Sequence, residues 1–257
     1  MTTALTSWFD RIADARAARR WRKVAERAGQ AGLEDLRSVR QSARRLRSDL
    51  DRVLHVAEGR LALPLIGANA MPRPLHCDWA WRPGIWAGPV DPPGLAAIET
   101  RTAYGTEVTV FHDCATSELT LRQTRNRRET DLAPFGLRMD VLGFDGSYLS
   151  LVVDLPETAV QGLSLRHVVR MDAVIETERP IEIFARLNVR HGPNTEQIVR
   201  EIPAGSTSAT VEFDLAYTRM NEKRVERAWV DLIFDNPRMN QIQLRDLTFS
   251  RRPRADV

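Results

Sequence analysis

The chain has 257 residues, of which 43% are hydrophobic and 28% are charged, and its net charge is +3. This composition excludes a disordered chain, and the length allows one large hydrophobic core plus an appendage. The two cysteines, Cys77 and Cys114, are too few for a disulfide framework. The sequence contains no run of roughly eighteen apolar residues, the length that a membrane-spanning helix needs.

Positive charge is concentrated at the N-terminal end. Residues 1–60 hold fourteen Lys and Arg against eight Asp and Glu, a net charge of +6, which leaves −3 for residues 61–257. We therefore divide the chain into a basic helical arm (1–60), a strap rich in Pro, Gly and Trp (61–95) and a β-sandwich (96–257). The N-terminus lacks the apolar stretch of a signal peptide, so we expect synthesis in the cytoplasm without Sec export.

Apolar residues in the arm recur every three or four positions, which is the spacing of one face of an α-helix. The first predicted helix covers residues 4–28 and ends where Gly29 and Gly32 interrupt the pattern. The second helix carries an a/d heptad seam formed by Leu36, Val39, Ala43, Leu46, Leu50, Val53 and Ala57. A seam of about three heptads is marginal alone, so it packs on the first helix, on the sandwich or on other copies in a homo-oligomer.

Two other partners suit a basic helix. Arginines bind the phosphates of nucleic acid, and they also attract an anionic membrane surface, into which Trp8, Phe9 and Ile12 would insert. Acidic residues interleave with these arginines, which is typical of a solvated helix face. We therefore rank both partners below self-association and below packing within the chain.

Seven prolines and four glycines lie between residues 61 and 95. Proline removes a backbone donor and fixes φ, so this stretch is predicted to be an extended strap along the outside or edge of the sandwich. Trp79, Trp81 and Trp86 favour burial of the strap against the sandwich. The alternative is an exposed aromatic platform on which sugar rings stack.

From about residue 96, apolar and polar residues alternate with the period of β-strands. The strand candidates are 107–111, 118–122, 137–143, 147–154, 171–176, 181–190, 210–217, 228–234 and 242–250. The last of them needs a β-bulge near Arg245–Asp246 to keep Leu244 and Leu247 on one face. Short strands without interleaved helices predict a mainly β protein, an antiparallel β-sandwich or jelly roll of the galactose-binding-like type, with an N-terminal α-helical arm.

One face of the strand 181–190 presents a ring, two guanidinium groups and an amide, from Phe184, Arg186, Asn188 and Arg190. We expect neighbouring strands to add Asp214, Tyr217, Asp231 and Gln243. Aromatic rings stack on the apolar faces of sugars, and polar side chains pair with sugar hydroxyls, so this face is a candidate glycan site. The alternative is a solvated face with cross-strand ion pairs.

Three other groups of residues could form a functional site, but each also has a simpler explanation. The polar loop 191–197 is either a ligand contact or an ordinary turn, which we prefer. The pairs His76–Cys77 and His112–Cys114 contain the atoms of a zinc site or a Cys–His nucleophile, but they lack the usual ligand spacing, so we expect no metal and no cofactor. Carboxylates for glycoside hydrolysis are available, as in any β domain, at Glu212, Asp214, Asp231 and Asp235.

Several segments carry a family resemblance. Residues 145–252, with DGSYLSLVVDL, MDAVIE, FARLN and AWVDLIFDNPRMNQIQLRDLTFSRR, resemble jelly-roll carbohydrate-binding modules, which implies a buried aspartate at Asp246. The whole chain, with HVAEGRLALP, DWAWRP, LAPFGLRMDV and FDLAYTRMNEKRVE, resembles an uncharacterised family of alphaproteobacterial proteins from the Rhodobacter and Roseobacter group. That family brings no assigned activity. Such bacteria carry phage-like gene transfer agents, and a part in such a particle suits a leaderless chain.

These observations lead to one expected function and two alternatives. We expect a non-catalytic β-sandwich module that binds polysaccharide or forms a structural part of a surface or phage-like assembly. The first alternative is a carbohydrate-active enzyme that uses acidic residues on the same sheet face. The second is a purely structural or interaction protein.

Overall fold

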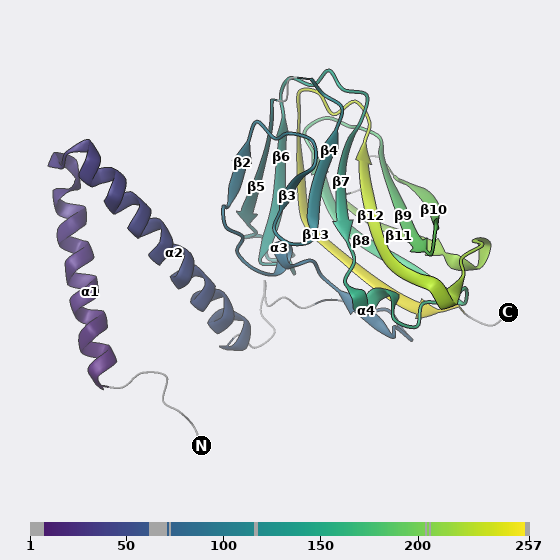
Figure 1. Cartoon of the computed structure of the whole chain (residues 1–257), viewed down its shortest axis with the longest axis horizontal. Helices are drawn as coiled ribbons and strands as arrows, with labels where there is room; N and C mark the ends of the chain where they lie inside the picture. The colour runs from purple at the N-terminus through teal and green to yellow at the C-terminus, as the bar shows by residue number, and fades with distance from the viewer. Residues whose placement is uncertain are drawn as a thin grey trace. The chain divides into compact units, whose positions relative to one another are not determined.

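The computed structural model describes residues 8–61, 71, 73–115, 118–203, 205 and 207–254, without the side chains of 8–12, 55, 56 and 58–61. The chain forms two compact units, Met1–Asp51 and Arg52–Val257 (Figure 1). The boundary between the units falls inside the second helix of the arm.

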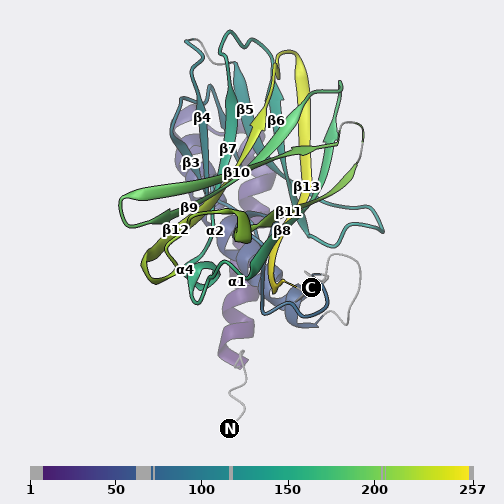
Figure 2. The same ribbon diagram turned by 90° about the vertical axis from the view of Figure 1, so that its right-hand side faces the viewer.

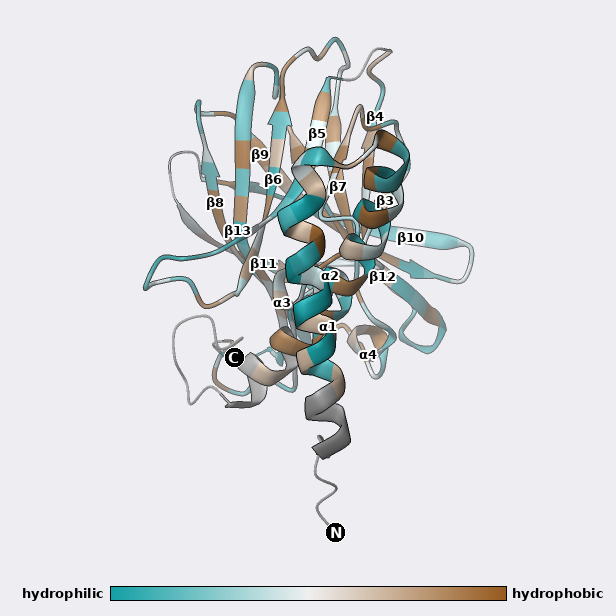
Figure 3. Cartoon of the chain, turned by 90° about the vertical axis from the view of Figure 1, so that its left-hand side faces the viewer, coloured by the Kyte–Doolittle hydropathy of each residue, from teal (hydrophilic) through white to brown (hydrophobic). Residues whose placement is uncertain are grey.

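The arm consists of two helices joined by a short turn. Helix α1 spans Trp8–Arg27, the 3-10 turn η1 spans Ala28–Gln30, and α2 spans Leu33–Leu61. The predicted pair of helices with a break at Gly29 and Gly32 is therefore confirmed. Apolar and polar segments alternate along both helices, as amphipathic helices require (Figure 3). None of the described helices is long and apolar enough to cross a membrane.

Two antiparallel sheets form the sandwich, and neighbouring strands within each sheet are mostly distant in the sequence. The seven-stranded sheet contains, in spatial order, β11 (Ser208–Asp214), β8 (His167–Thr177), β13 (Asn240–Pro253), β6 (Phe135–Val141), β5 (Leu119–Arg125) and β2 (Gly94–Ala96), with β1 (Trp79–Trp81) also paired to β13. The six-stranded sheet contains β10 (Asn194–Ile202), β9 (Ile183–His191), β12 (Val225–Phe234), β7 (Leu149–Asp154), β4 (Val108–His112) and β3 (Thr102–Tyr104). This arrangement confirms the predicted antiparallel sandwich with a helical segment before it.

Short helical pieces occupy some of the connections. They are α3 (Gly84–Ala87), α4 (Glu157–Val160), η2 (Leu215–Tyr217) and η3 (Glu222–Arg224).

Period-2 alternation along the strands builds the core between the sheets. In β13 the side chains of Ile242, Leu244, Leu247 and Phe249 are all at most 1% exposed. The register of β13 against β8 shifts between Leu244 and Asp246, so the predicted β-bulge is confirmed. The extra residue lets both Leu244 and Leu247 point into the core, which a regular strand does not allow.

The strap joins the core and does not merely cover it. Trp86 in α3 is completely buried, and its indole N–H donates to the carbonyl oxygen of Leu244 at 3.0 Å. Arg82 forms a two-pronged ion pair with Asp246, with both N–O distances 2.8 Å. Trp81 stacks on Phe249 with ring centroids 5.9 Å apart. The sequence favours burial of the three tryptophans of the strap. This holds for Trp86, whereas Trp79 and Trp81 are half-buried.

A buried tyrosine also ties the strap to the sandwich. The hydroxyl of Tyr104 donates to the carbonyl oxygen of Pro93 at 2.9 Å and accepts from the backbone N–H of Gln123 at 3.1 Å. Burial raises the pKa of Tyr104 to about 12, against an ordinary value of 10.0. The neutral phenol is thus the form that the fold favours.

Because the pKa of Tyr104 is raised, the fold loses stability at high pH. The stabilisation from Tyr104 is fully present below pH 10.0 and is lost as the pH rises through about 12. Between pH 9 and pH 11.5 we expect the free energy of unfolding to fall in the unmodified chain and in Tyr104→Phe. The fall in the unmodified chain should be larger by about 1–2 kcal/mol. Urea denaturation at several pH values measures this. The matched control is Tyr148→Phe, because this tyrosine is 42% exposed; its free energy of unfolding should fall with pH as much as that of the unmodified chain. If both variants lost the pH dependence equally, the effect could not be assigned to Tyr104.

Candidate functional site on the six-stranded sheet

The predicted polar row lies on the outer face of the six-stranded sheet. In β9 the alternate residues Ile183, Ala185, Leu187 and Val189 are buried in the core. The pleat therefore directs Phe184, Arg186, Asn188 and Arg190 to the opposite face. We call this outer surface of β10, β9, β12 and β7 the sheet face.

Strand pairing decides which side chains join this row. Asn188 lies opposite Trp229 of β12 and Gln197 of β10, and Arg186 lies opposite Asp231 of β12. Trp229 in turn lies opposite Asp154 of β7. Strands β9, β10 and β12 run next to one another (Figure 2). The row from Gln197 to Asp154 thus crosses four strands and is about 14 Å wide.

A buried carboxylate organises the centre of the sheet face. Asp231 is 3% exposed and accepts hydrogen bonds from Arg186, whose Nε lies 2.8 Å from Oδ2, and from the Asn188 amide at 3.1 Å. The Gln197 amide donates to Oδ1 of Asn188 at 3.0 Å. This network fixes the orientation of Arg186, whose side chain is 35% exposed, and of Gln197, which is exposed.

An indole lies beside this network and is also held by charged neighbours. The guanidinium carbon of Arg227 is 5.1 Å from the ring centroid of Trp229, within the range of a cation–π contact. Arg227 also donates to the Asp154 carboxylate. Trp229 and Phe184 are both half-buried, so part of each ring is accessible to a ligand.

The arginines of the sheet face are all neutralised locally. Arg186 pairs with Asp231, Arg227 with Asp154, and Arg190 with Glu226 at 3.2 Å. The face therefore offers many hydrogen-bonding groups but little net charge. Such a surface suits a hydroxyl-rich neutral ligand better than a polyanion.

The structure does not bring three of the predicted residues to this face. Asp214 ends β11, where it caps η2, and Gln243 lies on β13, where its amide donates to the Thr124 hydroxyl at 3.0 Å; both strands belong to the seven-stranded sheet. Tyr217 follows β11 in η2, is 80% exposed, and has Arg254 5.5 Å from its ring centroid. The expectation that neighbouring strands place them beside Phe184 is wrong, because β9 pairs with β10 and β12 instead.

The same topology separates the carboxylates considered for hydrolysis. Asp214 and Glu212 belong to β11 in one sheet, while Asp231 belongs to β12 in the other. Asp231 is also already engaged with Arg186 and Asn188. Asp231 therefore lies in a different sheet from Glu212 and Asp214, which pair with Arg252 and Arg254.

The two cysteines and His112 have separate local partners. The Cys77 thiol donates to the carbonyl oxygen of Trp79 at 2.9 Å, and the Cys114 thiol donates to Asp145 at 2.7 Å. His112 contacts the carbonyl oxygen of Ile98 at 2.9 Å. Among the described residues, no group of three or more His, Cys, Asp and Glu side chains is arranged to hold a metal ion.

The heptad seam of α2 is covered unevenly. Leu36, Val39 and Ala43 are half-buried, whereas Leu46, Leu50 and Val53 are 38%, 54% and 65% exposed. Self-association through this seam stays a prediction. The side chains of Trp8, Phe9 and Ile12, named for membrane insertion, lie outside the described residues.

Sequence reasoning missed Gln197 and Trp229 as members of the site. Gln197 belongs to the predicted loop 191–197, but only Gly192 and Pro193 form the turn, and β10 begins at Asn194. Trp229 alternates with the inward residues of β12, so its outward direction was already evident in the sequence. The missing step was the pairing of β9 with β12.

A family model covers the whole chain. The model, described as a "Family of unknown function (DUF6478)", matches residues 1–257. The chain belongs to this family. No curated protein sequence matches the chain. The alphaproteobacterial origin stays a prediction.

Solved structures resemble parts of the chain at low identity. The enzymatically active domain of tailspike protein 4 of bacteriophage CBA120 has a TM-score of 0.40 and 8% identity, over 56% of this chain and 19% of the tailspike chain. The family 11 carbohydrate-binding module of Clostridium thermocellum, in complex with a β-1,3-1,4-mixed-linked tetrasaccharide, has a TM-score of 0.38 and 13% identity, over 61% of this chain and 95% of that module.

A third similar structure is that of a cyclase. The Stig cyclase Fisc from Fischerella sp. TAU has a TM-score of 0.36 and 11% identity, over 68% of this chain and 100% of the cyclase. Because all three TM-scores are below 0.5, we take the function of this chain from its own residues.

Proposed function

We propose that the sheet face binds a neutral polysaccharide. The observation that carries this proposal is the network around buried Asp231, which holds Arg186 and Gln197 outward beside the accessible ring of Trp229. Oriented donors and acceptors next to an aromatic surface are what pairs of sugar hydroxyls and apolar sugar faces require. Prior orientation also reduces the conformational entropy lost on binding.

The extent of the face favours a chain over a single sugar. The row from Gln197 to Asp154 crosses four strands, about 14 Å. Two pockets among the described residues lie elsewhere, one between α1 and α2 and one beside Ile183 and Ile202 at the end of the sandwich. A ligand on the sheet face would therefore lie across the strands, as an internal stretch of a polymer does.

We also propose that the arm makes the chain a structural part of a larger assembly, including a particle of the phage-like kind. The supporting observation is the exposed apolar stretch of α2 at Leu46, Leu50 and Val53. Exposed apolar residues in a heptad series are typical of helices that pair with another helix.

A binding measurement tests the glycan proposal. The full chain should be retarded in native gels that contain neutral polysaccharides such as mixed-linked β-glucan, xylan or agarose, and less in gels that contain alginate or heparin. Trp229→Ala should weaken the affinity about tenfold, because the variant loses the ring on which a sugar stacks; this corresponds to about 1.4 kcal/mol.

A matched control is available outside the sheet face. Tyr217→Ala also removes an exposed ring with an arginine above it, but from η2 and not from a strand of the sheet face. It should bind as the unmodified chain does. No retardation by any neutral polysaccharide, or equal losses in both variants, would overturn the proposal.

A further inference from the structure

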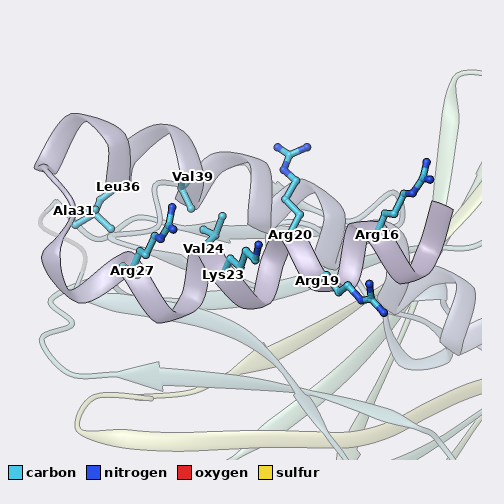
Figure 4. A pocket seen from close by; sticks show the side chains of 10 residues that line it. Arg16, Arg19, Arg20, Lys23, Val24, Arg27, Ala31, Leu36 and Val39 are labelled. Carbon is cyan, nitrogen blue, oxygen red and sulfur yellow. The ribbon is translucent and has the colours of Figure 1, made fainter. Parts of the chain in front are cut away.

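The two helices of the arm enclose a groove with an apolar floor and a basic wall. The groove has a volume of about 560 Å³. Its floor is formed by Val24, Ala28, Ala31, Leu36 and Val39. Its wall carries the cations of α1, which Figure 4 shows along one stretch of the helix: Arg16, Arg19, Arg20, Lys23 and Arg27.

These five cations are not neutralised within the described side chains. None of them has a carboxylate within 4.0 Å there, in contrast to the paired arginines of the sheet face. Their steps of three and four residues place them along one side of α1, over a length of about 16 Å. Because its positive charge is uncompensated, this wall attracts anionic groups.

The apolar floor continues along α2 beyond the groove. Leu36 and Val39 line it, and the same heptad seam then runs through Leu46, Leu50 and Val53, which are exposed. A helix laid along α2 would cover this seam with its own apolar stripe. One flank of that helix would then face the cations of α1.

We propose that this groove binds an acidic amphipathic helix of another protein. The partner helix needs an apolar a/d stripe of about three heptads for the α2 seam. It also needs carboxylates every three or four residues along one flank, opposite Arg16, Arg20, Lys23 and Arg27. This inference is independent of glycan binding by the sheet face.

The observations disfavour the other occupants. A second copy would bring the same row of cations to the interface, and the two long described helices, α1 and α2, are both net basic. An anionic bilayer is flat and meets the outermost side chains, whereas Val24, Leu36 and Val39 form the floor of a groove. Nucleic acid has phosphates for the wall but no apolar stripe for the floor.

A designed peptide tests the proposal with the full chain. The probe is a fluorescein-labelled four-heptad peptide with Leu at a and d and Glu at e and g; its counterpart has Lys at e and g. Fluorescence anisotropy should show binding of the acidic peptide and none of the basic one. Arg20→Glu with Lys23→Glu should weaken binding about tenfold or more, and higher salt should weaken binding to the unmodified chain.

The control changes the charge of the arm by the same amount elsewhere. Arg44→Glu with Arg45→Glu alters two exposed residues of α2 that do not line the groove, and it should leave the affinity within about twofold. Circular dichroism confirms that both double variants keep their helix content. Equal losses in the two double variants would overturn the proposal. So would binding of both peptides alike, self-association that Leu50→Asp abolishes, or binding to phosphatidylglycerol vesicles that only the groove variant loses.

Discussion

Replacing Trp86 with alanine is expected to lower the free energy of unfolding of the β unit by about 3–5 kcal/mol. Trp86 is completely buried, and its indole N–H satisfies the carbonyl oxygen of Leu244 beside the β13 bulge. The substitution leaves a large cavity and an unpaired buried carbonyl group, two effects that act in the same direction. Urea denaturation followed by near-ultraviolet circular dichroism measures the loss in the full chain.

Trp229→Ala provides the comparison within the same protein. Trp229 is half-buried on the outer face of the six-stranded sheet, so its removal opens no internal cavity. We expect it to cost less than half as much stability as Trp86→Ala. A loss below about 1 kcal/mol for Trp86→Ala would contradict the conclusion that the strap completes the core.

The sequence predicted those elements whose two faces differ in polarity. The β13 bulge was predictable because Ile242, Leu244, Leu247 and Phe249 are all apolar, and no regular strand puts them on one side. Strand β10 was missed for the opposite reason. It is the edge strand of its sheet, and each of its two faces carries both polar and apolar residues. The sequence therefore shows no alternation with period 2 there.

The candidate site was predictable within a strand but not between strands. The face shared by Phe184, Arg186 and Asn188 follows from the pleat alone. The choice of neighbours depends on pairing between residues that are forty or more positions apart, such as Arg186 with Asp231. The hydrophobic pattern does not encode that strand order, which is why Asp214 and Gln243, on strands of the other sheet, were expected beside Phe184.

Replacing Asp231 with alanine is expected to lower the free energy of unfolding by about 2–3 kcal/mol. The substitution leaves the completely buried Asn188 amide and the Arg186 guanidinium without their shared acceptor. The cost stays below that of a fully buried pair, because the Arg186 side chain is 35% exposed and water solvates part of its charge. Urea denaturation measures the change.

Asp154→Ala is the matched control, because it also removes a carboxylate that pairs with an arginine on the same face. The side chains of Arg227 and Asp154 are 54% and 36% exposed, so this pair should contribute only about 0–1 kcal/mol. Similar losses in the two variants would contradict the organising role that we assign to Asp231. The comparison therefore separates a buried network from an ordinary surface ion pair.

Removing both members of the Asp231 pair separates its effect on stability from its effect on binding. The double substitution of Arg186→Met and Asp231→Leu leaves no uncompensated charge, so most of the stability lost in Asp231→Ala should return. Polysaccharide affinity should not return, because the outward guanidinium is gone and Gln197 loses the anchored Asn188 that orients it. If affinity recovered together with stability, the network would serve the fold alone, and recognition would rest on Trp229 and Phe184.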